Sequence, residues 1–447
     1  MKIKKKKLII LITLLILGFV LRFYRYSYFP VIGETADESA WAMLGASLIQ
    51  DQEPMAWSHF GAYVEHGAVV DEDSHLVKPS LDHPPLFSLI PGIVHALQQR
   101  PIDQPSIKAV RFPMIILGVI NIYLLYVLAN KIFKKNKLAV YFSTAIYTMA
   151  PIFVFSSRLV LAENWLITLI LLSLIFIYKK KKTKQDYQLL FLISLVAVLS
   201  KFSGLILPAS LLVLGFKENN RKYRKIGLFS AVLGLSLFAL YGAIFNWQLF
   251  VDVLLSQSNR QLGLATILNC LFLHPMIVDR LFIDGWLFLG LLAGFSLIFS
   301  KQKKTKKWLP LTILFLMNLG FVLMSVGEQS FHGWYGYLNY PFLILASGDL
   351  LARIIKKGNT LLFAFIWILL LPSIRLAMRC LGIYLEMDQM ILRLIGLLGF
   401  IPLGLDFFNK KLSKKMMWLV LVIIILANLL VVFKLTHEIY WEDNLFF

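Results

Sequence analysis

Long apolar runs, separated by short clusters of basic residues, constrain this chain more than any other feature. Several runs reach the roughly 20 residues that an α-helix needs to cross a hydrocarbon core of about 30 Å. Backbone polar groups find no water in that core, so each run is expected to be helical. With 447 residues and a mean hydropathy of +0.73, the chain is predicted to be an all-α polytopic membrane protein.

The basic clusters predict how these helices alternate across the membrane, because lysine and arginine accumulate in cytoplasmic loops. The clusters span residues 2–7, 131–137, 179–184, 217–225, 301–307, 353–357 and 410–415. Placing all of them in the cytoplasm predicts about 13 transmembrane helices (range 11–13) without a parity error. The predicted spans are residues 8–26, 107–130, 138–157, 163–178, 187–200, 203–216, 226–246, 285–300, 308–326, 337–352, 360–378, 390–407 and 416–434.

This topology places the N-terminus in the cytoplasm and the C-terminus outside. The first apolar run is longer than a signal-peptide core and no small-residue cleavage site follows it, so it is predicted to be a retained anchor. The spans at 187–200 and 203–216 are short, which suggests that one of them is re-entrant or strongly buried. The net charge of +20 lies in loops rather than on a folded soluble face, so nucleic acid is not an expected partner.

Two outer loops are long enough to carry a site, at residues 27–106 and 247–284. The first reverses the charge of the chain, with eleven acids against two bases, and it holds five of the eight histidines. Thr35 and Glu38 have the spacing of a capping box before a helical stripe. Asp82 precedes two prolines that suit a second helix start. Both segments are predicted to be amphipathic helices on the outer membrane surface.

The acids of this loop have a structural and a chemical interpretation. Asp37 and Glu38 suit the first turn of a helix, where negative charge interacts favourably with the macrodipole. An ionised carboxylate at such a place is also suited to be a general base, which makes Asp37 the catalytic candidate, with Glu38 beside it. Asp82 and His83 either begin the second helix or face the same site.

Ionisable residues at the predicted outer ends of spans are the other site candidates. Either they extend to the membrane surface, or they bind an anion such as a lipid phosphate. Arg158 and Glu163 are close enough in sequence to form an ion pair, whereas Lys201 has no partner nearby in the chain. The set comprises Arg111, Arg158, Glu163, Lys201, Arg260 and His332.

In this order, the motifs resemble those of the C-type (GT-C) integral-membrane glycosyltransferases. The resemblance is to the dolichyl-phosphate-mannose protein mannosyltransferase and lipid A aminoarabinose transferase superfamily. It extends over residues 1–350, a catalytic core, and leaves 351–447 as variable C-terminal helices. The motifs are "ADE" at 36–38, "DHPPL" at 82–86, "APIFVFSSRLVLAEN" at 150–164, "LSKFSG" at 199–204 and "GWYGYLNYPFLIL" at 333–345.

The resemblance implies a hexosyl- or pentosyltransferase that takes its sugar from a polyprenyl-phosphate donor, with inversion. Asp37 would be the base, and Arg158, Lys201 and Arg260 would neutralise the donor phosphate. The acceptor, which is a lipid, glycan or protein, would arrive on the extracytoplasmic side of the plasma membrane. His83 matches the mannosyltransferase branch, whereas aminoarabinose transferases have a lysine there. The chain lacks the large β-trefoil insertion of eukaryotic protein mannosyltransferases, which favours a prokaryotic enzyme.

No cofactor is required on this interpretation, although Asp37, Asp82 and His83 are an alternative set of ligands for a divalent metal. Two other functions remain open from the sequence. A polysaccharide or lipid transporter would place ionisable residues deep in several spans or in paired broken helices. A surface-polysaccharide polymerase or ligase would have its large outer loop late in the chain, whereas the long loop here comes first.

Overall fold

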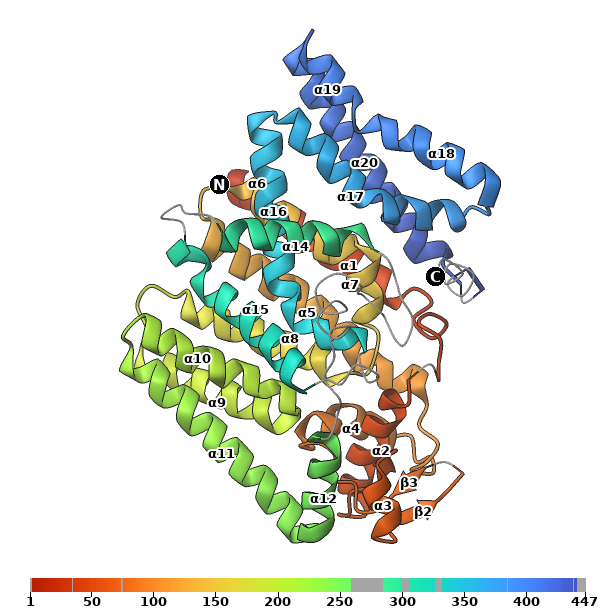
Figure 1. The fold of residues 1–447 in the computed structure, drawn as a ribbon, viewed down its shortest axis with the longest axis vertical. Coiled ribbons are helices and arrows are strands. Elements are labelled where there is room, and N and C mark those ends of the chain that lie inside the picture. Colours follow the sequence, from red (N-terminus) through yellow and green to blue (C-terminus); the bar gives the residue numbers. More distant parts are fainter. Residues whose placement is uncertain are drawn as a thin grey trace.

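A bundle of helices makes up most of the molecule (Figure 1). The computed structural model describes residues 2–33, 35–73, 75–258, 284–299, 305–325, 332–383, 385–436 and 438–439. The helices of the bundle are α1 (Lys2–Phe23), α5 (Ile107–Phe133), α6 (Lys137–Met149), α7 (Pro151–Ser156), α8 (Ala162–Ile177), α9 (Lys184–Ser200), η2 (Phe202–Leu205), α10 (Ile206–Lys217), α11 (Arg221–Phe245), α14 (Gly285–Ile298), α15 (Thr305–Ser325), η4 (Gly333–Asn339), α16 (Tyr340–Lys357), α17 (Thr360–Arg379), α18 (Leu385–Leu398), α19 (Ile401–Asp406) and α20 (Lys410–Lys434).

Every predicted span is mostly helical where it is described, and a membrane-embedded protein is therefore supported. By length and composition, six helical stretches of the described residues are sufficient to cross a membrane. The predicted total of about 13 spans goes beyond these six and stays a prediction. The six stretches are Ile107–Phe133, Arg221–Phe245, Lys307–Ser325, Gly333–Lys357, Thr360–Arg379 and Lys410–Lys434.

Two predicted spans are each broken into two helices, which corrects the sequence prediction. In the first, Ala150 has extended backbone (φ −68°, ψ 129°) between α6 and α7. Pro151 follows it, and a proline disfavours helical backbone at the residue before it. In the second, α18 and α19 meet at Gly399, whose missing side chain leaves room for the ring of Trp367.

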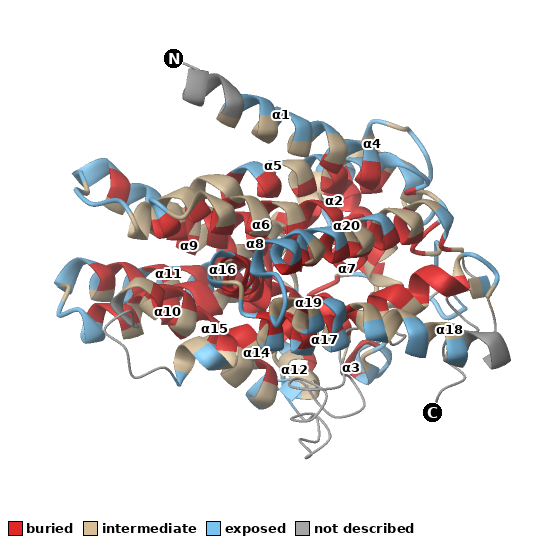
Figure 2. Ribbon diagram, turned by 90° about the horizontal axis from the view of Figure 1, so that it is seen from above, coloured by how far each residue is buried: buried red, intermediate tan, exposed pale blue. Residues whose placement is uncertain are grey.

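Buried residues lie in the interior of the bundle, and exposed residues lie on its periphery (Figure 2). The largest apolar cluster joins α5, α6, α8, α14, α16, α17 and α20. Large apolar side chains are also exposed on several helices, for example Leu228, Phe229, Leu240 and Ile244 on α11. A soluble protein rarely exposes so continuous an apolar surface, whereas lipid tails would cover it.

The first outer loop folds as a small cap at one end of the bundle (Figure 1). Its elements are α2 (Asp37–Gln50), β1 (Ala56–Trp57), α3 (Gly61–Glu65), β2 (Val69–Asp71), β3 (Leu76–Val77), η1 (Leu86–Ser88) and α4 (Leu89–Ala96). The strands pair antiparallel in the order β1-β3-β2, with Ala56 opposite Val77 and Val69 also opposite Val77. Helices were predicted from Thr35 and from Asp82, and α2 and α4 confirm them.

The second outer stretch is described as far as Ser258, through α12 (Trp247–Ser258). Leu249, Phe250 and Val253 of α12 pack against Tyr63 of α3 and Val77 of β3. This contact joins the two outer stretches into one layer. Arg260, a predicted phosphate ligand, lies outside the described residues.

Candidate active site

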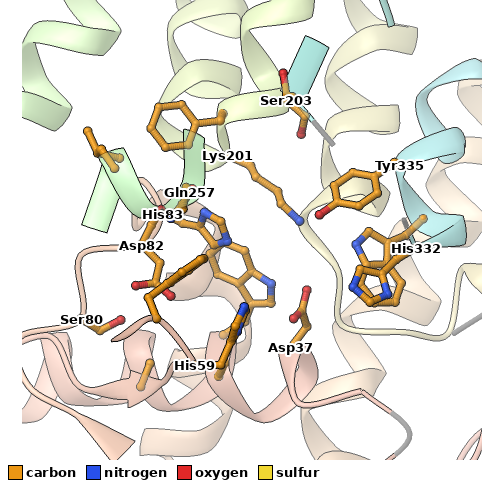
Figure 3. A pocket seen from close by; sticks show the side chains of 18 of the residues that line it. Asp37, His59, Ser80, Asp82, His83, Lys201, Ser203, Gln257, His332 and Tyr335 are labelled. Atoms are coloured by element: carbon orange, nitrogen blue, oxygen red, sulfur yellow. Dashed lines mark hydrogen bonds between the residues drawn. The ribbon is translucent and has the colours of Figure 1, made fainter. Parts of the chain in front are cut away.

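A cavity of about 650 Å³ lies between the cap and the bundle. Its walls come from the start of α2, the segment 56–60, the segment 80–83, the turn after α9, the end of α12, the end of α15 and η4 (Figure 3). Five of the predicted site residues therefore meet in one space, although they are far apart in sequence. They are Asp37, Asp82, His83, Lys201 and His332.

Asp37 is the first residue of α2, and its side chain extends into the cavity toward Lys201 (Figure 3). Its backbone N–H donates to Oγ1 of Thr35 at 3.2 Å. Among the described residues, no side chain or backbone N–H donates a hydrogen bond to its carboxylate. The carboxylate is therefore available to accept a proton from a bound molecule.

Lys201 supplies the positive charge of the cavity. It follows α9 in extended backbone (φ −168°, ψ 155°), and its Nζ lies 2.8 Å from Oε1 of Glu163. Burial alone would lower the pKa of Lys201, but the nearby carboxylates of Glu163 and Asp37 outweigh burial and raise it. The ammonium group therefore stays charged, and it faces both carboxylates. The sequence hypothesis of an Arg158–Glu163 pair is wrong, because Glu163 pairs with Lys201.

The turn that presents Lys201 depends on the glycine of the "LSKFSG" motif. A Cβ at Gly204 would lie 1.8 Å from the carbonyl oxygen of Ala197. Only glycine therefore allows η2 to fold back so closely on the end of α9. The Lys201 ammonium also lies near the rings of Trp41 and Tyr335, 5.8 and 5.9 Å from their centroids. Aromatic faces at these distances attract a cation.

Glu38 and Arg111 form a buried ion pair behind the cavity rather than part of its lining. Nε of Arg111 donates to Oε1 of Glu38 at 2.8 Å, and Nη2 donates to Oε2 at 2.5 Å. The N–H of Val160 also donates to Oε1, at 3.0 Å. The predicted capping box is therefore wrong: Glu38 is fully engaged elsewhere, and α2 has no side-chain cap. This pair ties the start of α2 to α5.

Arg158 lies away from the cavity lining and binds the end of α1. Its guanidinium donates to the carbonyl oxygens of Phe29 and Leu21, each at 2.6 Å, and of Tyr24 at 2.8 Å. Cationic side chains are favourable at helix C-termini, where carbonyl groups lack partners. The structure therefore places Arg158 as a buried link between α1 and the turn after α7, not beside Lys201.

Asp82 and His83 line the cavity on the side away from His332 and Tyr335 (Figure 3). The Asp82 carboxylate accepts hydrogen bonds from Oγ of Ser58, at 2.8 Å, and from the hydroxyl of Tyr63. Burial, together with the Asp82 carboxylate, raises the pKa of Tyr63 above its usual value, so that hydroxyl remains a donor. The His83 ring stacks on Trp41 with 5.3 Å between centroids.

His332 and Tyr335 close the cavity on the side of η4. The His332 ring stacks on Trp334, with centroids 4.2 Å apart and planes at 6°. Sequence reasoning did not select Trp41, Ser58, Tyr63, Trp334 or Tyr335, although the aromatic motif at 333–345 was a visible signal. Ser58 and Tyr63 have no such signal, because only the fold brings them to Asp82.

The carboxylates and histidines of the cavity are not grouped as metal ligands. Across the described part of the chain, no three His, Cys, Asp or Glu side chains are placed to hold one ion. Asp37, Asp82 and His83 share the cavity, and the alternative of a divalent metal held by these three residues stays a hypothesis.

Residues 82–244 match the family described as dolichyl-phosphate-mannose-protein mannosyltransferase. None of the curated proteins compared matches the sequence. Among solved structures, ArnT from Cupriavidus metallidurans bound to undecaprenyl phosphate has a TM-score of 0.56 at 12% identity, over 97% of this chain and 77% of ArnT. The archaeal oligosaccharyltransferase AglB from Archaeoglobus fulgidus has a TM-score of 0.51 at 14% identity, over 93% of this chain and 56% of AglB.

The family match covers the end of the cap and the bundle through α11, which includes Asp82, His83 and Lys201. The structural matches extend the same fold over nearly all of the chain. Together they agree with the resemblance inferred from the sequence motifs: residues 82–244 match the protein mannosyltransferase family, and nearly the whole chain is similar in fold to ArnT and AglB.

Proposed function

We propose that this protein transfers a sugar from a polyprenyl-phosphate carrier to an acceptor on the extracytoplasmic side of the plasma membrane. The observation that carries the proposal is the meeting of the Asp37 carboxylate and the Lys201 ammonium in one cavity. One group takes up a proton, and the other stabilises negative charge. Both are needed when a hydroxyl or amine displaces a phosphate from a sugar.

The relatives suggest the class of donor. The ArnT structure is described as bound to undecaprenyl phosphate, and the AglB structure as a complex with a dolichol-phosphate. A donor of this class would place its lipid in the membrane and its phosphate at the outer rim of the bundle. On this proposal, the phosphate binds beside Lys201, between α9 and η2.

The reaction would proceed as a single displacement with inversion. The acceptor oxygen or nitrogen forms a bond to the anomeric carbon, and the bond from that carbon to the phosphate oxygen breaks. Its electron pair goes to the phosphate, where Lys201 neutralises the new charge. The acceptor proton goes to Asp37. Ser58, Tyr63 and the stacked Trp41 fix Asp82 and His83 around the same space, and His332 and Tyr335 bound it on the other side.

Asp37→Asn tests the base directly. Purified protein would be incubated with radiolabelled polyprenyl-phosphate sugars and an extract of cell-envelope acceptors, and release of label from the lipid would be followed. We expect Asp37→Asn to lose about 10²–10⁴-fold in rate, which is the usual contribution of a general base. Asp103→Asn removes an exposed acid of the same loop that does not line the cavity and should keep full activity.

Two results would contradict the proposal. Equal rates for Asp37→Asn and the unmodified protein would exclude Asp37 as the base. Failure to consume any polyprenyl-phosphate sugar, when the same extract supports a known transferase, would exclude the donor class.

A further inference from the structure

A second hollow lies between α9 and α11, with a volume of about 760 Å³. We call it the lysine groove, because Lys184, Lys222 and Lys225 line one end of it. Phe191, Phe229 and Leu233 are among the apolar residues that line the rest. No reaction step proposed above uses any of these residues.

The groove lies along the contact between α9 and α11. A Cβ at Gly234 of α11 would lie 2.6 Å from Cγ1 of Val198 of α9, so glycine permits close approach there. Nearer the helix starts, the two helices meet through larger side chains, and the ring centroids of Tyr187 and Tyr223 lie 6.1 Å apart. The groove is therefore built into the packing of α9 on α11.

The charged end of the groove is positive and has no acidic lining. None of its lining residues is Asp or Glu. The nearest acid of α9, Asp186, is engaged by Nζ of Lys179 at 2.9 Å and by the backbone N–H of Thr183 at 2.7 Å. Nζ of Lys222 lies 4.5 Å from the ring centroid of Tyr187, which holds it over the groove. The three ammonium groups are thus free to attract an anion.

The remainder of the groove faces hydrocarbon. α11 is one of the stretches that can span a membrane, and only 22% of its apolar window is buried in the protein. The side chains of Leu228, Val232 and Leu233 on α11 are exposed. An occupant must therefore combine an anionic head with apolar chains.

The groove is separate from the active-site cavity. Lys184 begins α9 and Lys201 follows its end, and a 17-residue helix is about 25 Å long. The donor phosphate proposed for Lys201 therefore cannot also reach Lys184. Lys184 and Lys201, at the two ends of α9, would therefore bind two different anions.

We propose that the lysine groove binds an anionic phospholipid of the leaflet opposite the active-site cavity. Its headgroup phosphate lies among Lys184, Lys222 and Lys225, and one acyl chain lies along Phe191, Phe229 and Leu233. Basic residues at this level are well suited to anionic headgroups. The bound lipid fills the space between α9 and α11 and so supports α9, the helix that precedes Lys201.

Native mass spectrometry of the full chain in detergent tests this site. The protein would be titrated with dioleoyl phosphatidylglycerol and, separately, with dioleoyl phosphatidylcholine. We expect the protein to bind phosphatidylglycerol more tightly than phosphatidylcholine. The lysines would then be replaced one after another, ending with Lys184→Ala/Lys222→Ala/Lys225→Ala. Each replacement should lower the ratio of the two affinities about fivefold. Leu233→Trp, which fills the apolar part, should weaken both lipids.

A matched control removes three exposed lysines at the start of α20, in Lys410→Ala/Lys411→Ala/Lys415→Ala. This variant should keep the preference of the unmodified protein. Equal losses in the two triple variants would show attraction to basic loops in general and would overturn the proposal. The proposal would also be overturned if the triple variant of the lysine groove bound phosphatidylglycerol normally, or if inorganic phosphate displaced the bound lipid.

Discussion

The buried charged residues of this chain differ in role because their partners differ. Arg111 pairs with a carboxylate, Arg158 binds backbone carbonyl oxygens, and Lys201 pairs with Glu163 while still facing a cavity. A buried charge without a partner costs several kcal/mol, so each of these groups must be compensated. Of these three cations, only Lys201 has its charge both compensated and directed into the cavity.

The Glu38–Arg111 pair should contribute to stability without touching the bound sugar. Glu38→Ala leaves the fully buried Arg111 guanidinium without its carboxylate, and we expect a loss of about 3–5 kcal/mol in unfolding free energy. A thermal-shift measurement in detergent would record this as a lower unfolding temperature. Glu53→Ala breaks the Lys78–Glu53 ion pair, whose side chains are about half exposed, and should leave the temperature unchanged. Equal shifts in both variants would contradict this assignment.

The Lys201–Glu163 pair allows folding and catalysis to be separated. Lys201→Met alone leaves a buried carboxylate unpaired, so it should reduce both stability and donor use. Lys201→Met/Glu163→Leu removes both charges and should recover much of the stability, because a buried pair is often replaceable by apolar residues. Sugar transfer should remain impaired in the double variant. If the double variant transferred sugar normally, the Lys201 charge would have no part in the reaction.

Distance along the chain decides which of these residues the sequence could predict. Asp37 was predictable because its position at a helix start is local. The Glu38–Arg111 and Glu163–Lys201 pairs join residues far apart in sequence, so a local capping box and a local Arg158–Glu163 pair were predicted instead. Backbone carbonyl groups, which hold Arg158, occur at every residue and leave no sequence signal.

At the scale of elements, the position of Asp37 depends on how α2 crosses α4. A Cβ at Gly45 would lie 1.9 Å from the carbonyl oxygen of Ser88, and one at Gly92 would lie 2.3 Å from the carbonyl carbon of Gly45. The two backbones are therefore in direct contact. Apolar periodicity predicted both helices, but not this contact, because two isolated glycines do not identify each other.

Separating these helices should displace Asp37 and Trp41 together. Gly92→Ala forces the backbones apart, and we expect a cost of at least about 1–3 kcal/mol along with reduced sugar transfer. Gly61→Ala is the matched control, because a Cβ at Gly61 meets no atom within 4 Å. The comparison requires an unfolding temperature and a transfer rate for each variant. Normal values for Gly92→Ala would mean that the contact does not position α2.

At the scale of the whole molecule, the acidic cap marks one end of the bundle. The acidic cap and α12 lie at one end of the bundle, and the N-terminus lies toward the other (Figure 1). The lengths of the apolar runs predicted where helices form. They did not predict the break at Ala150, which depends on Pro151, or the break at Gly399, which depends on packing against Trp367. Which end faces the cytoplasm stays a prediction, which rests on the accumulation of lysine in cytoplasmic loops.

This orientation predicts which loops a membrane-impermeant maleimide reaches in intact cells. Both natural cysteines would first be removed, with Cys270→Ser and Cys380→Ser. Glu72→Cys, in the exposed turn after β2, should then be labelled from outside, because the positive-inside rule places the acidic cap there. Lys180→Cys, in the exposed turn before α9, should be labelled only after the membrane is permeabilised. The reverse pattern would place Asp37 on the cytoplasmic side and exclude an acceptor that arrives from outside.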